Sequence, residues 1–199
     1  MMLCDLMLVL EKQFVYSIFN SIVMGKNKGS VHVSVDIEAD GPIVGKHSMI
    51  SFGMVIVEEG FKRGFYRELK PIGDEYVPEA LGVSGFTRSE TLKFMPPVQA
   101  MLEASQWLTE NIQGKPIMWA DNPGFDKSWM HWYFLTFTGN DPFGHSSRRI
   151  ADFICGIEGD LRFKWKHLRK TKHSHNALAD ATGNAEVLLH YFEKANIKY

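Results

Sequence analysis

The sequence predicts an α/β fold in which helices cover a mixed β-sheet. Three observations support this. Apolar and polar residues alternate from Val31 to Glu38, which is the period-two pattern of a β-strand. Two more strand-like segments follow closely, and the second half of the chain combines helical patterns with short apolar runs. With 199 residues, 45% of them hydrophobic, the chain can bury one core without a disulfide or a structural metal.

The elements are predicted to follow the order βββαβαβα. Three strands in immediate succession favour an antiparallel meander, and later strands separated by helices make the sheet mixed. Pro96-Pro97 opens the first helix and Gly114 ends it. The other expected elements are strands at 31–38, 49–57, 61–69, 116–120 and 149–153, and helices at 125–135 and 176–195.

Residues 1–30 are predicted to form an amphipathic helix and a short linker ahead of a functional domain at 31–199. One helical face carries the apolar residues Leu3, Leu6, Leu10, Phe14, Ile18 and Ile22. Charges interrupt the segment and no basic residue precedes its most apolar stretch, so neither a membrane span nor a secretory signal is expected. The apolar face favours packing on the domain or on a second copy, which makes a homodimer reasonable.

Charge and cysteine content set two further limits. The 22 Lys and Arg residues against 23 Asp and Glu leave a net charge of -1, so any site for a polyanion must be local. Two cysteines, Cys4 and Cys155, make no disulfide framework and are typical of a reducing compartment. A cytoplasmic protein that does not act on membranes is therefore expected.

The first chemical motif is Asp36-Ile37-Glu38 at the end of the first strand. Residues two apart in a strand point to the same face, about 7 Å apart along the chain. Two neighbouring carboxylates repel each other unless a cation lies between them. A solvated strand face would explain the same residues, and both interpretations stay open at this point.

Two further motifs lie near helix entries. Asp126 follows a short apolar strand and falls in the first turn of the next helix, where it can hold a ligand or complement the helix dipole. Asp121, in the same segment, is interpreted as a turn residue and not as a metal ligand. His175 and Asp180 lie at the entry of the last helix, and they can converge if His175 is on a flexible loop.

Together, Asp36, Glu38, Asp126, His175 and Asp180 resemble the DEDDh family of 3′–5′ exonucleases over residues 31–195. The segment from Asn122 to Asp126 is similar to the family's Asn-x-x-Phe-Asp, and His175 to Asp180 to its His-x-Ala-x-x-Asp. The run Leu81-Gly-Val-Ser-Gly-Phe-Thr87 is similar to a family Gly-Ile-Thr that precedes an acidic residue and a helix. Ala39-Asp40 and Asp121 depart from the usual residues, which leaves nucleotide preference open. The resemblance implies a ribonuclease-H-like fold.

The chemistry of phosphodiester hydrolysis agrees with this residue set. Two divalent cations about 4 Å apart can activate a water and neutralise phosphate and leaving-group charge. Mg²⁺ or Mn²⁺ suits carboxylate oxygens. The resemblance implies that Asp36 bridges both ions, that Glu38 and Asp180 hold one and that Asp126 holds the other. An imidazole such as His175 can take the proton of the attacking water.

Substrate contacts are expected from two places. The resemblance places Ala39, Asn122 and Phe125 beside the nucleotide. A basic run from Arg162 to Lys172, including Lys170 and Lys172, leads into the His175 motif and is either a phosphate track, with Trp165 as a stacking platform, or a solvated basic face.

The predicted function is a metal-dependent 3′–5′ exonuclease that releases nucleoside monophosphates from the 3′ end of single-stranded RNA or DNA. An endonuclease of the same fold is one alternative, and a non-catalytic nucleic-acid-binding module is another. The order of the acids along the chain, ending in His-x-Ala-x-x-Asp, favours the exonuclease over the endonuclease. All the metal-binding acids of the family pattern are present, which argues against a non-catalytic module.

Overall fold

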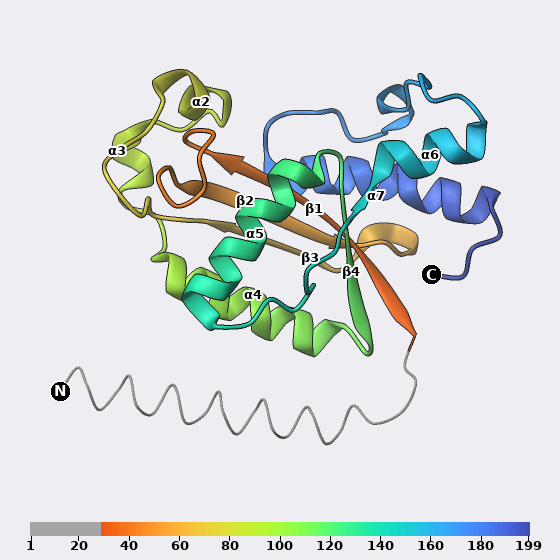
Figure 1. Ribbon diagram of the computed structural model, residues 1–199, viewed down its shortest axis with the longest axis horizontal. Helices are drawn as coiled ribbons and strands as arrows, with labels where there is room; N and C mark the ends of the chain where they lie inside the picture. The colour runs from red at the N-terminus through yellow and green to blue at the C-terminus, as the bar shows by residue number, and fades with distance from the viewer. Residues whose placement is uncertain (1–28) are drawn as a thin grey trace.

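A computed structural model describes residues 29–199 (Figure 1). The predicted amphipathic helix therefore lies outside the described residues, and Ser30, predicted as linker, already begins the first strand. The chain forms a five-stranded sheet in the order β3-β2-β1-β4-β5, with helices on both faces. The predicted α/β fold with a mixed sheet is confirmed.

The strands follow the predicted meander and crossover. β1 (Ser30–Ala39), β2 (Met49–Ile56) and β3 (Gly64–Glu68) pair antiparallel. β4 (Lys115–Ala120) lies parallel to β1 on its other side. The third strand is shorter than predicted, because the 3-10 turn η1 (Glu59–Phe61) takes the first of its expected residues.

The helices form a layer on each side of the sheet (Figure 1). α4 (Pro97–Asn111) and α5 (Pro123–Thr138) cover one face, while α7 (Ala177–Lys194) covers the other beside α6 (Ile150–Glu158). The short elements α2 (Pro78–Val83), α3 (Arg88–Thr91) and η2 (Lys166–Leu168) were not predicted. Among residues 29–199, no helix is long and apolar enough to cross a membrane.

The prediction of a strand at 149–153 is wrong. Only β5 (Arg148–Arg149) is extended, and α6 begins at Ile150. Ile150 and Ile154, one helical turn apart, are both buried in the cluster beneath α7. A short apolar run fits either a buried strand or a buried helix face, so periodicity alone could not decide between them.

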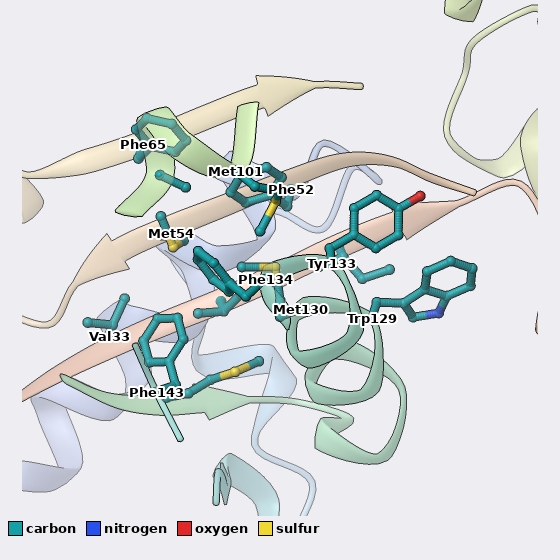
Figure 2. Close-up of a cluster of buried hydrophobic side chains, with 14 of the residues drawn as sticks. Val33, Phe52, Met54, Phe65, Met101, Trp129, Met130, Tyr133, Phe134 and Phe143 are labelled. Atoms are coloured by element: carbon teal, nitrogen blue, oxygen red, sulfur yellow. The ribbon is translucent and has the colours of Figure 1, made fainter. Parts of the chain in front are cut away.

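Two apolar clusters fill the space on either side of the sheet. The first lies under α4 and α5 and takes Val33, Val35 and Ile37 from β1 (Figure 2). Trp129 and Tyr133 of α5 are fully buried there. The Tyr133 hydroxyl accepts a hydrogen bond from the Met49 backbone amide at 2.7 Å, which ties α5 to the start of β2. The second cluster lies between the sheet and α6 and α7.

Candidate active site

The two acids of β1 project from the strand face that α7 covers. Asp36 lies opposite Gly53 of β2, and Glu38 lies opposite Ser51. Carboxylate oxygens of Asp36, Glu38 and Asp180 all lie within 4.8 Å of one another. Glu38 is 9% exposed and Asp180 is 1% exposed, so this is a nearly buried group of acids and not a solvated strand face.

The entry loop of α7 positions Asp180 and His175. The backbone amides of Ser174 and His175 donate to the two oxygens of Asp180 at 3.1 and 2.9 Å. The side chain of Asn176 caps the helix by accepting from the Ala179 amide at 3.0 Å. His175 adopts a left-handed backbone with φ of 57°, which brings its Nδ1 to 3.7 Å from a Glu38 oxygen. The bend of this loop is what allows two residues five positions apart to converge.

Gly53 allows α7 to approach the acids, and sequence reasoning did not identify it. A Cβ at this position would lie 2.5 Å from the backbone of Ala177 at the start of α7. Ala177 and Ala181 supply the small side chains on the helix side, and both are fully buried. A glycine inside a strand often indicates such a close backbone approach, so a signal was present in the sequence.

Asp126 approaches the same acids from α5. It is 4% exposed, and one of its oxygens accepts the Asn122 backbone amide at 3.3 Å. The backbone amide of Ile37, between the two acids of β1, also interacts with this carboxylate. Asp121 instead pairs with Lys166 at 2.5 Å, in keeping with its interpretation as a turn residue.

Burial and mutual repulsion keep these acids from ionising freely. Burial is the main cause that raises the pKa of Glu38 to about 8, followed by the charges of Asp180 and Asp126. Burial likewise raises the pKa of Asp126 to about 7. The pKa of Asp36 is raised well above its usual value by burial, then by the charges of Asp126, Glu38 and Asp180, against which the Arg169 cation acts.

A divalent cation fits this arrangement chemically. It would supply the positive charge that lets neighbouring carboxylates ionise together. The donors that converge from β1, α5 and α7 are carboxylate oxygens, which hard cations such as Mg²⁺ prefer. The acids are held by a strand and by two helix entries, so the donor set is largely formed in advance.

The basic run does not act as one continuous track. Trp165 is 3% exposed and lies in the second apolar cluster, which rules it out as a stacking platform for a base. The Arg169 guanidinium lies over the Trp165 ring at 5.0 Å and bonds to buried Asn184 of α7. The Lys170 backbone amide donates to Glu186 at 2.8 Å, while the side chains of Lys170 and Lys172 are exposed.

A groove of about 870 Å³ begins at Asp121 and Asn122, just before α5, and Asp36, Glu38, Asp126 and Asp180 are not among its lining residues. It runs between α6 and the segment that leads into η2, and Arg149, Arg162, Lys164, Lys166 and His167 are among its lining residues. Arg149 pairs with Asp152 and Lys166 with Asp121 within this lining. The excess of basic side chains makes the groove suitable for phosphates.

The other expected substrate residues differ in exposure. Asn122 is exposed at the N-terminus of α5, and Phe125 is partly buried with its ring 6.0 Å from that of Trp129. Ala39 is 8% exposed and belongs to the first apolar cluster, so its side chain is a core residue. Any contact from Ala39 to a nucleotide would have to come from its backbone.

Asp40, which departs from the family pattern, has a structural role. Its carboxylate accepts the Ser48 backbone amide at 2.5 Å and pairs with Arg88 of α3 at 3.0 Å. Thr87, at the end of the segment similar to the family's Gly-Ile-Thr, caps α3 in a reciprocal arrangement with Glu90. The end of β1 is thereby tied to the segment that contains α2 and α3.

Comparison with known proteins now identifies the family. Over 170 residues the chain is 31% identical to the 3′-5′ DNA exonuclease Cap18 of Escherichia coli, covering 79% of this chain and 89% of that protein. The chain belongs to the DEDDh family of 3′–5′ exonucleases. No family model matches the sequence.

Solved structures of DEDDh and related exonucleases share the fold. The nuclease domain of 3′hExo, a DEDDh member bound to rAMP, superposes with a TM-score of 0.70 at 13% identity, over 85% of this chain and 94% of that one. E. coli ExoI in a complex with single-stranded DNA gives a TM-score of 0.67 at 18% identity, over 85% of this chain and 42% of that one. The predicted ribonuclease-H-like fold is confirmed, and so is the predicted 3′–5′ exonuclease activity. Membership of this family implies that a divalent cation is required and that the substrate is a nucleic acid.

Proposed function

We propose that Asp36, Glu38, Asp126 and Asp180 hold two Mg²⁺ or Mn²⁺ ions and that His175 is the general base. The observation that supports this most directly is the convergence of carboxylate oxygens from β1 and α7 within 4.8 Å. Oxygens of Asp36 lie within 4.8 Å of oxygens of both Glu38 and Asp180, and the charge of Asp126 also raises the pKa of Asp36, which supports Asp36 as the ligand shared by both ions. Glu38 and Asp180 then serve one ion, and Asp126 serves the other.

One residue of the chain, His175, accounts for the removal of the proton from the attacking water. Bound divalent cations would neutralise phosphate charge and lower the pKa of the attacking water. His175 accepts the proton of that water as its oxygen attacks phosphorus and the bond from phosphorus to the 3′-oxygen breaks. The released 3′-oxygen takes a proton from solvent water, so the products are a nucleoside 5′-monophosphate and a strand shortened by one nucleotide with a free 3′-hydroxyl.

The proposed substrate is the 3′ end of single-stranded DNA. The name of the Cap18 relative supports DNA, and a single strand avoids the free-energy cost of unpairing the terminal base. Asn122, Phe125 and the backbone at Ala39 surround the terminal nucleotide in this proposal, with Lys170 and Lys172 attracting phosphates. The nucleotides 5′ of the scissile bond follow the basic groove beside Asn122.

End-blocked and circular substrates test the direction of attack. A strand with a 3′-phosphate should resist digestion in Mg²⁺, while a 5′-block should change nothing. Matched single-stranded DNA and RNA of equal length should be degraded at different rates, with DNA faster. Internal cuts in a circular single strand would favour the endonuclease instead, and binding without cleavage under every metal condition would favour a non-catalytic module.

The groove is tested by shortening the substrate. Arg162→Ala combined with Lys164→Ala should raise KM for a long strand and weaken its salt dependence, because each lost phosphate contact lowers the salt slope by about one. The same variant should leave cleavage of a dinucleotide unchanged. Lys115→Ala is the matched control, since Lys115 is an exposed lysine at the opposite end of β4 from Asp121. Equal effects on long and short substrates would place the strand elsewhere.

The homodimer and the division at residue 30 rest on the N-terminal sequence. The apolar face that the sequence pattern predicts for residues 1–24 supports self-association through that segment. Light scattering of the full chain should then give twice the 22.7 kDa chain mass, and removal of residues 1–28 should give a monomer. A monomeric full chain would exclude the homodimer.

A further inference from the structure

His173 lies beside the acids but has no part in the proposed chemistry. Its Nδ1 is 2.9 Å from an oxygen of Asp180, and its ring contacts the ring of His175 edge-on at a centroid distance of 4.3 Å. Ligand atoms of His173, His175 and Asp180 all lie within 4.8 Å of one another. This second group of donors differs from the acids of the first because it contains two imidazoles.

We propose that His173 joins His175 and Asp180 in a site for a borderline transition-metal ion that overlaps the proposed Mg²⁺ site, with Zn²⁺ as the preferred occupant. Imidazole nitrogen together with carboxylate oxygen is a donor set that suits Zn²⁺, whereas Mg²⁺ prefers oxygen ligands. Ligand atoms in a tetrahedral zinc site are about 3.3 Å apart. Both histidine side chains are about half exposed, at 52% and 46%, so small rotations can bring the donors to that spacing.

The surrounding structure prepares these ligands. Two backbone amides, from Ser174 and His175, hold the Asp180 carboxylate in a fixed orientation, which is the role that hydrogen bonds to a metal ligand commonly have. The left-handed backbone of His175 folds the loop so that both rings lie near the same carboxylate. Such a conformation costs a non-glycine residue about 1 kcal/mol or more and is often found at functional sites.

Glu38 can complete a four-coordinate site. One of its oxygens is 3.7 Å from the His175 Nδ1. A zinc ion held by two imidazoles and one or two carboxylates would occupy Asp180 and His175 at once. Because the proposed function needs Asp180 as a ligand for Mg²⁺ and His175 as the base, zinc bound here should inhibit the nuclease. The inhibition thus rests on the proposed function, while zinc binding itself does not.

The experiment measures zinc binding without catalysis and then inhibition. Zinc is titrated into the full chain in excess Mg²⁺, in competition with a chromophoric chelator. The wild type should bind one zinc ion per chain, and His173→Gln should weaken the affinity at least about tenfold. Glutamine keeps a hydrogen-bond donor for Asp180 but is a poor zinc ligand, so the change isolates ligation. His190→Ala, which removes an exposed histidine further along α7, is the matched control and should bind zinc like the wild type.

The same variants are then assayed in Mg²⁺ with increasing zinc. His173→Gln should raise the zinc concentration for half-inhibition by the same factor as its loss of zinc affinity, with the zinc-free rate within about twofold of wild type. Unchanged zinc affinity in His173→Gln, or no zinc binding in excess Mg²⁺, would overturn the proposal. A protein that binds zinc through His173 but cleaves no nucleic acid would overturn the proposed function and leave this site standing.

Discussion

Helices cover both faces of β1, but the two faces are chemically opposite, and Asp36 on the acidic face is only partly buried. On one face Val33, Val35 and Ile37 pack under α5 and are at most 4% exposed. On the other face Asp36 and Glu38 lie under the first turn of α7. A strand with one apolar face is expected to leave its polar face in water. Here a helix covers that face as well, and the acids are enclosed with it.

This difference separates stability from activity along one strand. Burial of the valines removes apolar surface from water and stabilises the fold. Burial of the acids has the opposite effect, as their raised pKa values show. A divalent cation bound between these carboxylates would offset the unfavourable free energy of burying them. Substitutions at adjacent positions of β1 should therefore have separable effects.

The largest effect is expected when an acid of the α7 face is neutralised. Asp36→Asn or Glu38→Gln removes a ligand of the two proposed metal ions. Because this loses several kcal/mol of transition-state stabilisation, kcat should fall at least about 10³-fold. Single-turnover assays in saturating Mg²⁺ measure this directly. Near wild-type turnover by Glu38→Gln would contradict the assignment of this face.

Val35→Ala on the opposite face is the matched control. It should lower the free energy of unfolding by about 2–3 kcal/mol and leave the rate of the folded enzyme nearly unchanged. In chelator, Asp36→Asn should instead be more stable than wild type at neutral pH. Because the pKa of Asp36 is higher in the folded than in the unfolded chain, ionisation of Asp36 lowers the wild-type stability once the pH exceeds the pKa of the unfolded chain. The higher stability of Asp36→Asn should therefore vanish near pH 4. Urea unfolding at several pH values separates the two variants.

The next effect concerns the base on the entry loop of α7. His175→Ala should lower kcat by about 10²–10⁴-fold, the usual contribution of a general base, without changing Mg²⁺ affinity. The acidic limb of its pH–rate profile should flatten. His173→Ala should cost far less activity in zinc-free buffer, and the reverse ranking would mean that the third motif is assigned to the wrong histidine.

The close approach of α7 to the acid face can be disturbed from the sheet side. Gly53→Ala places a methyl group 2.5 Å from the Ala177 backbone, so the start of α7 must shift. A displacement of about 1 Å at Asp180 is enough to lower the rate roughly 10²-fold. Gly64→Ala in β3 is a suitable comparison, because its added Cβ would first meet the end of the flexible Leu178 side chain at 3.3 Å. Equal rates for the two variants would show that the helix tolerates the shift.

The local sequence predicted the placement of the acidic residues better than the burial of the β1 face that carries two of them. Alternation in β1 placed Asp36 and Glu38 on one face, and Asp126 was predicted in a first helical turn. Asp180 was predicted just over one turn inside the last helix and lies in its first turn. These are properties of short segments. The burial of that face depends on Gly53 and Ala177, which are far apart in the sequence and meet only in the folded chain.

The errors have the same origin. The run of charges favoured exposed basic side chains, as either a phosphate track or a solvated face, but Arg169 turns inward to Asn184 and Trp165 is buried beneath it. Whether a basic side chain faces water or a buried amide depends on α7, which follows later in the chain. The strand predicted at 149–153 failed because its apolar residues fit both periodicities, and only their packing under α7 selects the helix.

The smallest effect is expected at His32, at the other end of the same β1 face. This ring is 7% exposed, accepts a hydrogen bond from the Trp119 indole at 2.8 Å and lies 4.8 Å from the Phe192 ring. Burial, followed by the charge of Arg148, lowers the pKa of His32 to about 4. Because the pKa of His32 is lower in the folded than in the unfolded chain, the stability that neutral His32 contributes is fully present above pH 6.5, near the pKa of the unfolded chain. It is lost as the pH falls toward 4.

The acids of this face have raised pKa values, so in chelator their contribution to stability has the opposite sign and increases as pH falls. Both proteins contain these acids, so the acids cancel when the unfolding free energy of His32→Gln is subtracted from that of the wild type. Between pH 7 and pH 5 the wild type should lose about 1–2 kcal/mol more unfolding free energy than His32→Gln, in which no imidazole at this position takes up a proton. Parallel pH profiles for the two proteins would show that the ring can accept a proton in place, and that the α7 face tolerates charge at both ends of β1.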